Sequence, residues 1–199
     1  MPNLDYNEYL ISLKESLDKS EVTEGKHTFS ETQLSTGLQH IFDLVYECKK
    51  LNQSLFICGN GGSAGIAQHM TADYLKNGGI RAQSLFNAAS ITCVVNDLDF
   101  RHIFAGQLDI LAKPDDVLIA ISSSGNSEDI VFAAETMHRI GGKVISLSGF
   151  DKDNHLRKTG DINYYVPCKS YGIVESVHTI ILQMIVDDIV ERDGTALKL

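Results

Sequence analysis

The spacing of apolar positions along the chain changes near residue 50. Before that point apolar side chains recur every three or four residues, which predicts helices over 6–17 and 34–45 with a polar connection over 21–30. Beyond it, short apolar runs alternate with stretches of helical period. The short runs predict strands over 55–58, 82–86, 117–121, 144–148 and 162–166. The stretches of helical period predict helices over 63–75, 88–96, 127–140 and 173–192.

Strands that alternate with helices indicate an α/β fold with a mostly parallel sheet. We expect one domain over residues 1–199, with N-terminal helices in 1–50 and the α/β core with its C-terminal helix in 51–199. The last helix carries a broad apolar stripe that includes Ile181. The sequence leaves two partners open for this stripe: the sheet of the same chain, or the N-terminal helices of another subunit.

Composition narrows the class of protein. The chain has 26 acidic and 17 basic side chains and a formal net charge of -9, which argues against a surface for nucleic acid or acidic membranes. No apolar run approaches the length of a membrane span, and residues 1–20 lack the pattern of a secretory signal. The four cysteines show no close pairing, so free thiols in a reducing compartment are expected. We therefore expect a cytoplasmic protein.

Two turns rich in glycine and serine follow two of the predicted strands. The first, Gly-Asn-Gly-Gly-Ser, spans 59–63, and the second, Ser-Ser-Ser-Gly-Asn-Ser, spans 122–127. Such a turn directs backbone N–H groups and the positive end of the following helix dipole at one spot, and serine hydroxyls add further donors. Each turn taken singly is also an ordinary strand-to-helix connection. Because parallel strands bring their carboxyl ends together, we expect both turns to hold phosphate at one ligand site.

Two common phosphate-binding classes do not fit these turns. Neither turn ends in the Gly-Lys-Ser/Thr of a nucleoside triphosphate loop. The first turn also lacks the clearly placed downstream acid of a dinucleotide fingerprint. The pattern therefore favours a phosphate monoester held by neutral hydrogen bonds.

Acid and imidazole side chains that follow the first turn suggest chemistry beside it. His69 and Asp73 lie one helical turn apart, a spacing that suits a divalent metal or a positioned base. An exposed surface pair is the ordinary alternative. Glu175, His178 and Gln183 interrupt the apolar stripe of the last helix, as solvated edge positions or as part of a metal or substrate site.

Together these motifs resemble the sugar isomerase (SIS) domain of the phosphoheptose isomerases. The resemblance rests on 59–63, Gln-His at 68–69, Val-Asn-Asp at 95–97 and Ile-Ser-Ser-Ser-Gly-Asn-Ser at 121–127, and it covers nearly the whole chain. It implies a flavodoxin-like three-layer fold and a homotetramer with active sites between subunits. The implied substrate-binding residues are Asn60, Gly61, Gly62, Ser63, Asp73, Asn96, Asp97, Ser122, Ser123, Ser124, Ser127 and Glu175. Without the resemblance, Asn96-Asp97 would be interpreted as a turn.

The family reaction moves a proton between C1 and C2 of an open-chain sugar phosphate, with a glutamate and a histidine exchanging protons. A histidine, that glutamate, a glutamine and the second histidine hold zinc. The matching positions here, and the zinc site that the resemblance implies, are His69, Asp73, Glu175 and Gln183. Asp73 and Gln183 thus occupy the catalytic positions, but Gln183 cannot exchange protons. Glu175 and His178 are candidates to restore the carboxylate and the imidazole.

The resemblance implies an aldose-ketose isomerase that converts sedoheptulose 7-phosphate to a heptose 7-phosphate for activated-heptose biosynthesis. Two alternatives stay open. One is a non-catalytic SIS protein that binds a sugar phosphate or a replication initiator. The other is a SIS isomerase for a different sugar phosphate, because the phosphate loops contact only the end that all such sugars share.

Overall fold

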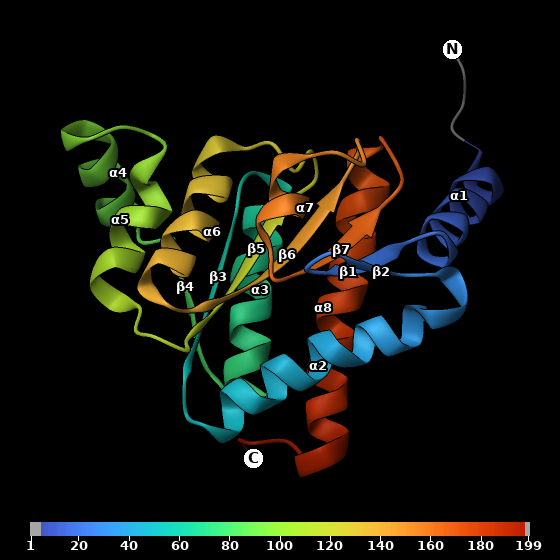
Figure 1. The fold of residues 1–199 in the computed structure, drawn as a ribbon, viewed down its shortest axis with the longest axis horizontal. Coiled ribbons are helices and arrows are strands. Elements are labelled where there is room, and N and C mark those ends of the chain that lie inside the picture. Colours follow the sequence, from blue (N-terminus) through green and yellow to red (C-terminus); the bar gives the residue numbers. More distant parts are fainter. Residues whose placement is uncertain (1–4, 198–199) are drawn as a thin grey trace.

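The computed structural model describes residues 5–197 and contains one seven-stranded sheet in the order β2-β1-β7-β6-β5-β3-β4 (Figure 1). Strands β3 to β7 are parallel, and β1 and β2 join them as an antiparallel edge. The parallel strands, counted along the chain, have the doubly wound order 2-1-3-4-5 of flavodoxin-like folds. This confirms the predicted fold class. The strands are β1 (Glu21–Glu24), β2 (His27–Phe29), β3 (Ser54–Gly59), β4 (Arg81–Ser84), β5 (Val117–Ser122), β6 (Lys143–Gly149) and β7 (Ile162–Val166).

Helices cover both faces of the sheet (Figure 1). α2, α3 and α8 contribute to the apolar core on one face, whereas α5, α6 and α7 contribute to the core on the other. α4 packs against α5 and has no buried residue of its own. The helices are α1 (Tyr6–Asp18), η1 (Glu31–Gln33), α2 (Leu34–Lys50), α3 (Gly62–Lys76), α4 (Ala88–Asp97), α5 (His102–Leu111), α6 (Glu128–Ile140), α7 (His155–Thr159) and α8 (Tyr171–Asp193).

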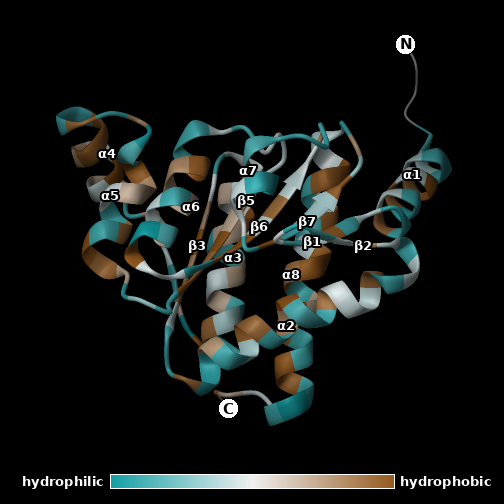
Figure 2. Ribbon diagram, in the orientation of Figure 1, coloured by the Kyte–Doolittle hydropathy of each residue, from teal (hydrophilic) through white to brown (hydrophobic). Residues whose placement is uncertain are grey.

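The central strands have apolar side chains on both sides because helices exclude water from both faces. In β3, Leu55 and Ile57 belong to the core beneath α3 and α8, and Phe56 and Cys58 to the opposite core. Every residue of β3 and β5 is buried. Figure 2 shows the corresponding apolar colouring along these strands and along α8.

The polar connection predicted over 21–30 is wrong. That segment forms the β1–β2 hairpin, which turns at Gly25 with φ +55° and extends the sheet beyond β7. Only Val22 and Phe29 of the hairpin are buried, and a β-carbon on Gly37 of α2 would overlap Val22. Because this edge of the sheet is largely solvated, the hairpin has few apolar positions. The alternation of apolar and polar residues that predicts a strand is therefore weak.

Two α-helices and the short helix η1 were not predicted from the sequence. α5 buries Ile103, Phe104 and Leu108, and the five-residue α7 buries Leu156. The remaining predicted helices and strands are present, with ends shifted by a few residues. α8 settles one open alternative, because Val177 and Ile181 pack into the core of this chain. Across residues 5–197, no helix combines the length and apolar character needed to cross a membrane.

Candidate active site

A pocket of about 360 Å³ lies where β3 and β5 end side by side. The helices that follow these two strands, α3 and α6, cover opposite faces of the sheet. The pocket therefore occupies the topological switch point, the usual ligand site of open α/β sheets. Its lining residues are Asn60, Gly61, Gly62, Ser63, Ile121, Ser122, Ser123, Ser124, Ser127, Tyr171 and Glu175.

The serine-rich turn after β5 presents hydroxyl groups to this pocket. Ser122 Oγ lies 3.2 Å from Ser127 Oγ and 3.5 Å from Ser124 Oγ. Ser127 is the N-cap of α6, but its side chain makes no capping hydrogen bond. Ser123 Oγ is buried and has no protein partner in the described chain. An unsatisfied hydroxyl of this kind close to a helix N-terminus is suited to an oxygen of an anion.

The glycine turn after β3 holds a carboxylate from this chain. Gly61 has φ +54°, and Gly62 begins α3. Any β-carbon on Gly62 would overlap the carboxylate of Glu175, which lies directly against the glycine backbone. A negative charge is stabilised at a helix N-terminus, so Glu175 occupies the position that we expected a phosphate to take. The two turns therefore differ: a carboxylate from α8 lies against the start of α3, whereas the serine turn keeps an unpartnered hydroxyl at Ser123.

A buried carboxylate links the two turns. Asp129, in the first turn of α6, is only 1% exposed. Both of its carboxylate oxygens lie 2.9 Å from Nδ2 of Asn60. Burial raises the pKa of Asp129, whereas the hydrogen bond from Asn60 opposes that shift. Sequence reasoning did not single out Asp129, because an acid in the first turn of a helix is ordinary on a solvated surface.

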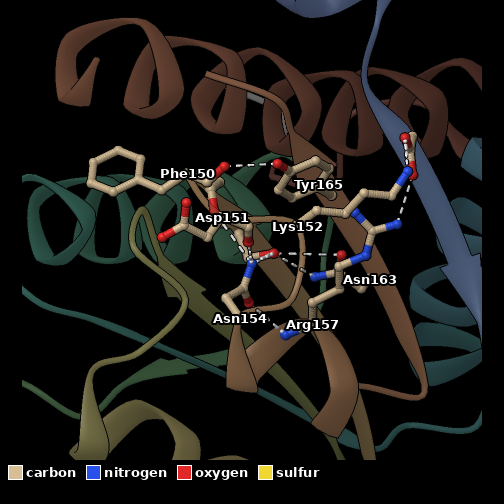
Figure 3. Close-up of polar contacts among 10 residues, drawn as sticks. Phe150, Asp151, Lys152, Asn154, Arg157, Asn163 and Tyr165 are labelled. Carbon is tan, nitrogen blue, oxygen red and sulfur yellow. Dashed lines mark hydrogen bonds and ion pairs between the residues drawn. The ribbon is translucent and has the colours of Figure 1, made fainter. Parts of the chain in front are cut away.

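The β6–α7 connection, whose polar contacts are drawn in Figure 3, lies against Gly125 of the serine turn. The buried amide of Asn154 donates to Gly149 O and Ser148 Oγ, and its oxygen accepts from the backbone N–H of Arg157. The N–H of Leu156 donates to Gly125 O over 2.8 Å. The serine turn is thus fixed by a second loop. Sequence analysis did not identify this loop, because it contains no motif.

The His69–Asp73 pair lies away from the pocket. His69 Nε2 is 3.3 Å from Asp73 Oδ2, and the His69 side chain is 66% exposed. Neither residue lines the pocket. Asp73 stands 11 residues beyond Gly62 on α3, or roughly 16 Å along the helix axis. Within this chain, His69 and Asp73 therefore have the geometry of an exposed surface pair, the ordinary alternative to a metal site.

The two other candidates on α8 also lie outside the pocket lining. His178 is fully buried, with Nε2 3.2 Å from the carbonyl oxygen of Ser148 on β6. Because a carbonyl only accepts, His178 donates through Nε2–H. Burial lowers the pKa of His178 to about 4. Gln183 is half-buried two turns beyond Glu175 on α8.

Asn96 and Asp97 lie at the C-terminal end of α4 and are exposed. Asn96 Nδ2 donates to Asp97 Oδ1 over 2.8 Å, so the two side chains contact each other. They do not line the pocket of their own chain.

Of the residues expected to hold zinc, only His69 and Asp73 form a polar contact with each other in the described part of the chain. His69 pairs with Asp73, while Glu175 lies against Gly62 at the other end of α3. In the part of the chain that the structure describes, no three His, Cys, Asp or Glu side chains form a group that could hold a metal ion. Zinc binding therefore stays a prediction, and we derive no chemical step through a metal.

Comparison with known proteins identifies the family. The model of the SIS domain matches residues 19–149. A phosphoheptose isomerase from Clostridium acetobutylicum is 32% identical over 181 residues, which cover 88% of this chain and 91% of the relative. One from Helicobacter pylori is 32% identical over 191 residues, which cover 93% of each chain.

Solved structures of phosphoheptose isomerases are similar to this chain as well. A phosphoheptose isomerase from Francisella tularensis superposes with a TM-score of 0.82 at 29% identity, covering 96% of this chain and all of that one. The phosphoheptose isomerase from Neisseria gonorrhoeae gives 0.78 at 27% identity, covering 94% and 95%. The fold, the two turns and these similarities lead to one conclusion: the chain belongs to the SIS domain family and, within it, to the phosphoheptose isomerases.

Proposed function

We propose that this protein is an aldose-ketose isomerase that converts sedoheptulose 7-phosphate to a glycero-manno-heptose 7-phosphate for activated-heptose biosynthesis. One observation carries the proposal: the serine turn and the Glu175 carboxylate line the same pocket of about 360 Å³. The pocket thus offers an anion site and a proton acceptor together. Membership of the phosphoheptose isomerases supports the reaction class.

The phosphate of the substrate binds at the serine turn in this proposal. The unpartnered hydroxyl of Ser123 and the cluster at Ser122, Ser124 and Ser127 supply neutral donors. The N-terminus of α6 adds backbone N–H groups and its dipole. Like-charge repulsion keeps the phosphate away from Glu175, so the sugar extends from the serine turn toward the carboxylate.

Glu175 moves the proton in this proposal. Its carboxylate removes a proton from C1 of the open-chain ketose, and the electron pair forms the C1–C2 double bond of an enediolate. The same carboxyl group returns a proton at C2, while the proton on the C1 hydroxyl transfers to the C2 oxygen, giving the aldose. Glu175 thus takes the role that a different position holds in the family pattern.

The test is isomerisation of sedoheptulose 7-phosphate by the purified protein, with and without added zinc. We expect heptose 7-phosphate in the wild type. Ser123→Ala should raise KM several-fold with little change in kcat, because one hydrogen bond to the phosphate is lost in ground and transition states alike. Ser12→Ala on exposed α1 is the matched control. No heptose 7-phosphate under either condition would contradict the proposal, and turnover of a shorter ketose phosphate instead would identify the other sugar isomerase.

A second candidate is a non-catalytic SIS protein that binds a sugar phosphate or a protein such as a replication initiator. The observation in its favour is that Asp73 and Gln183, at the two catalytic positions of the family, do not line the pocket. Such a protein would still bind phosphate at the serine turn. Deuterium exchange at C1 of the substrate in heavy water would exclude it.

A further inference from the structure

Asp129 and Asn60 form a contact that the proposed chemistry does not use. Asn60 follows β3, Asp129 belongs to α6 after β5, and they are 69 residues apart in the sequence. The Asn60 amide nitrogen is 2.9 Å from each oxygen of the buried carboxylate. The turn after β3 and the first turn of α6 are therefore joined by a part-buried hydrogen bond to a carboxylate.

The chemistry of this contact fixes the orientation of the Asn60 amide. An ionised carboxylate only accepts hydrogen bonds, so the NH₂ group of Asn60 has to face Asp129. The carbonyl Oδ1 is then the polar atom left for other partners. No protein group among residues 5–197 donates to it, and Asn60 lines the pocket. Without Asp129 the amide would be free to present either end.

An acceptor at this position complements the rest of the pocket. The serine turn supplies hydroxyl donors for a phosphate, whereas a sugar chain carries hydroxyl groups that themselves need acceptors. An NH₂ group directed into the pocket would add one more donor for any anion. An oxygen there instead favours the hydroxylated part of the ligand.

We propose that Asp129 is a positioning residue for substrate recognition: it holds Asn60 as a hydrogen-bond acceptor for a hydroxyl of the sugar phosphate. This inference rests on the proposed function, because it takes a sugar phosphate as the ligand. Asp129 itself does not line the pocket, and it acts through Asn60.

The experiment measures the affinities of two ligands, inorganic phosphate and sedoheptulose 7-phosphate, by calorimetry. Asp129→Leu keeps the approximate volume and removes both acceptors. We expect it to weaken sugar phosphate binding about tenfold, as for one lost hydrogen bond, and to leave phosphate affinity within about twofold. Asp129→Asn, which keeps one oxygen facing Asn60, should recover most of the affinity. The adjacent, exposed Glu128→Leu is the matched control.

A double-mutant cycle completes the test. Asn60→Ala should weaken sugar phosphate binding as much as Asp129→Leu, and the double variant should lose no more than either alone. Additive losses of affinity in the double variant, or equal losses of affinity for both ligands, would show that Asp129 has a structural role only and would overturn the inference. If Asp129→Leu fails to fold, unchanged sugar phosphate affinity in Asn60→Ala would also overturn it.

The result separates this inference from the proposed function. A wild type that binds the sugar phosphate without isomerising it would remove the proposed reaction, while the binding cycle would still decide on Asp129. A wild type that binds sedoheptulose 7-phosphate no more tightly than inorganic phosphate would overturn both.

Discussion

The side chain of Asn154 fills the space beside Gly125 that a β-carbon on that glycine would need. Gly125 has φ +67°, in the left-handed region that favours glycine, and its backbone carbonyl accepts from Leu156 N. The serine turn therefore has its shape for two reasons, a backbone angle and a close neighbour. The position of Asn154 beside the turn cannot be predicted from the residues of the turn itself.

This contact makes Gly125→Ala a sharp probe of the phosphate site. We expect it to destabilise the fold by about 2 kcal/mol or more, because it combines an unfavourable φ with overlap at Asn154. Phosphate binding should be lost with it. Denaturant unfolding and phosphate titration measure the two effects. The control is Gly65→Ala in α3, where a β-carbon meets nothing within 4 Å and stability should rise by about 0.5 to 1 kcal/mol. Equal effects at both glycines would contradict the role of Asn154.

The placement of Glu175 predicts which α8 residue carries turnover. Glu175→Gln should lower kcat by about 100-fold or more, since the amide cannot act as a base. Gln183→Ala should have a much smaller effect, because Gln183 does not line the pocket. Steady-state kinetics with sedoheptulose 7-phosphate, in the presence and absence of zinc, compares the two. Similar losses in both variants would count against a site centred on Glu175.

His178 predicts a pH dependence of stability. Burial lowers its pKa from 6.5 to about 4, so the unfolded chain takes up a proton at a higher pH than the folded protein does. The neutral His178 therefore contributes to the free energy of unfolding above pH 6.5. This contribution, about 3 kcal/mol in total, is lost as the pH falls toward 4. Urea unfolding at pH 7 and pH 4.5 measures this loss.

His178→Gln supplies the comparison, because glutamine keeps a donor for Ser148 O and does not titrate. Between pH 7 and pH 4.5, the free energy of unfolding of this variant should fall by about 2 to 3 kcal/mol less than that of the wild type. His155→Gln at an exposed position should behave like the wild type. An equal loss in wild type and His178→Gln would refute the assignment.

The exposed apolar side chains at the α4 and α5 end of the molecule bear on the predicted homotetramer. Leu98, Phe100 and Ile110 are 62%, 57% and 84% exposed. An interface between copies would bury exposed apolar side chains of this kind. Light scattering should give a mass near four chains for the wild type and a lower mass for Leu98→Asp combined with Ile110→Asp. Leu51→Asp, at an exposed position after α2, is the control. An unchanged mass in the double variant would place the interface elsewhere.

Local patterns in the sequence were sufficient for much of the fold. The run 117–121 is apolar at every position because β5 is covered on both faces, and this predicts a buried parallel strand. The serine turn at 122–127 likewise predicts a phosphate site, because backbone and hydroxyl donors lie next to one another in the chain. The hairpin at 21–29 was missed because only Val22 and Phe29 are buried there, which gives a weak strand period. α5 was missed although its buried residues Ile103, Phe104 and Leu108 have helical spacing.

By itself, then, the sequence determined the five parallel strands, most of the helices and the donor groups of the serine turn, because each depends on neighbours along the chain. Only the tertiary structure decided that Glu175 lies against Gly62 and that Asp129 holds Asn60. It also decided that His178 is buried and that Asp73 is remote from the pocket. These outcomes depend on how α3, α6 and α8 pack around the sheet, and the burial and charge of a side chain follow from that packing and not from its own motif.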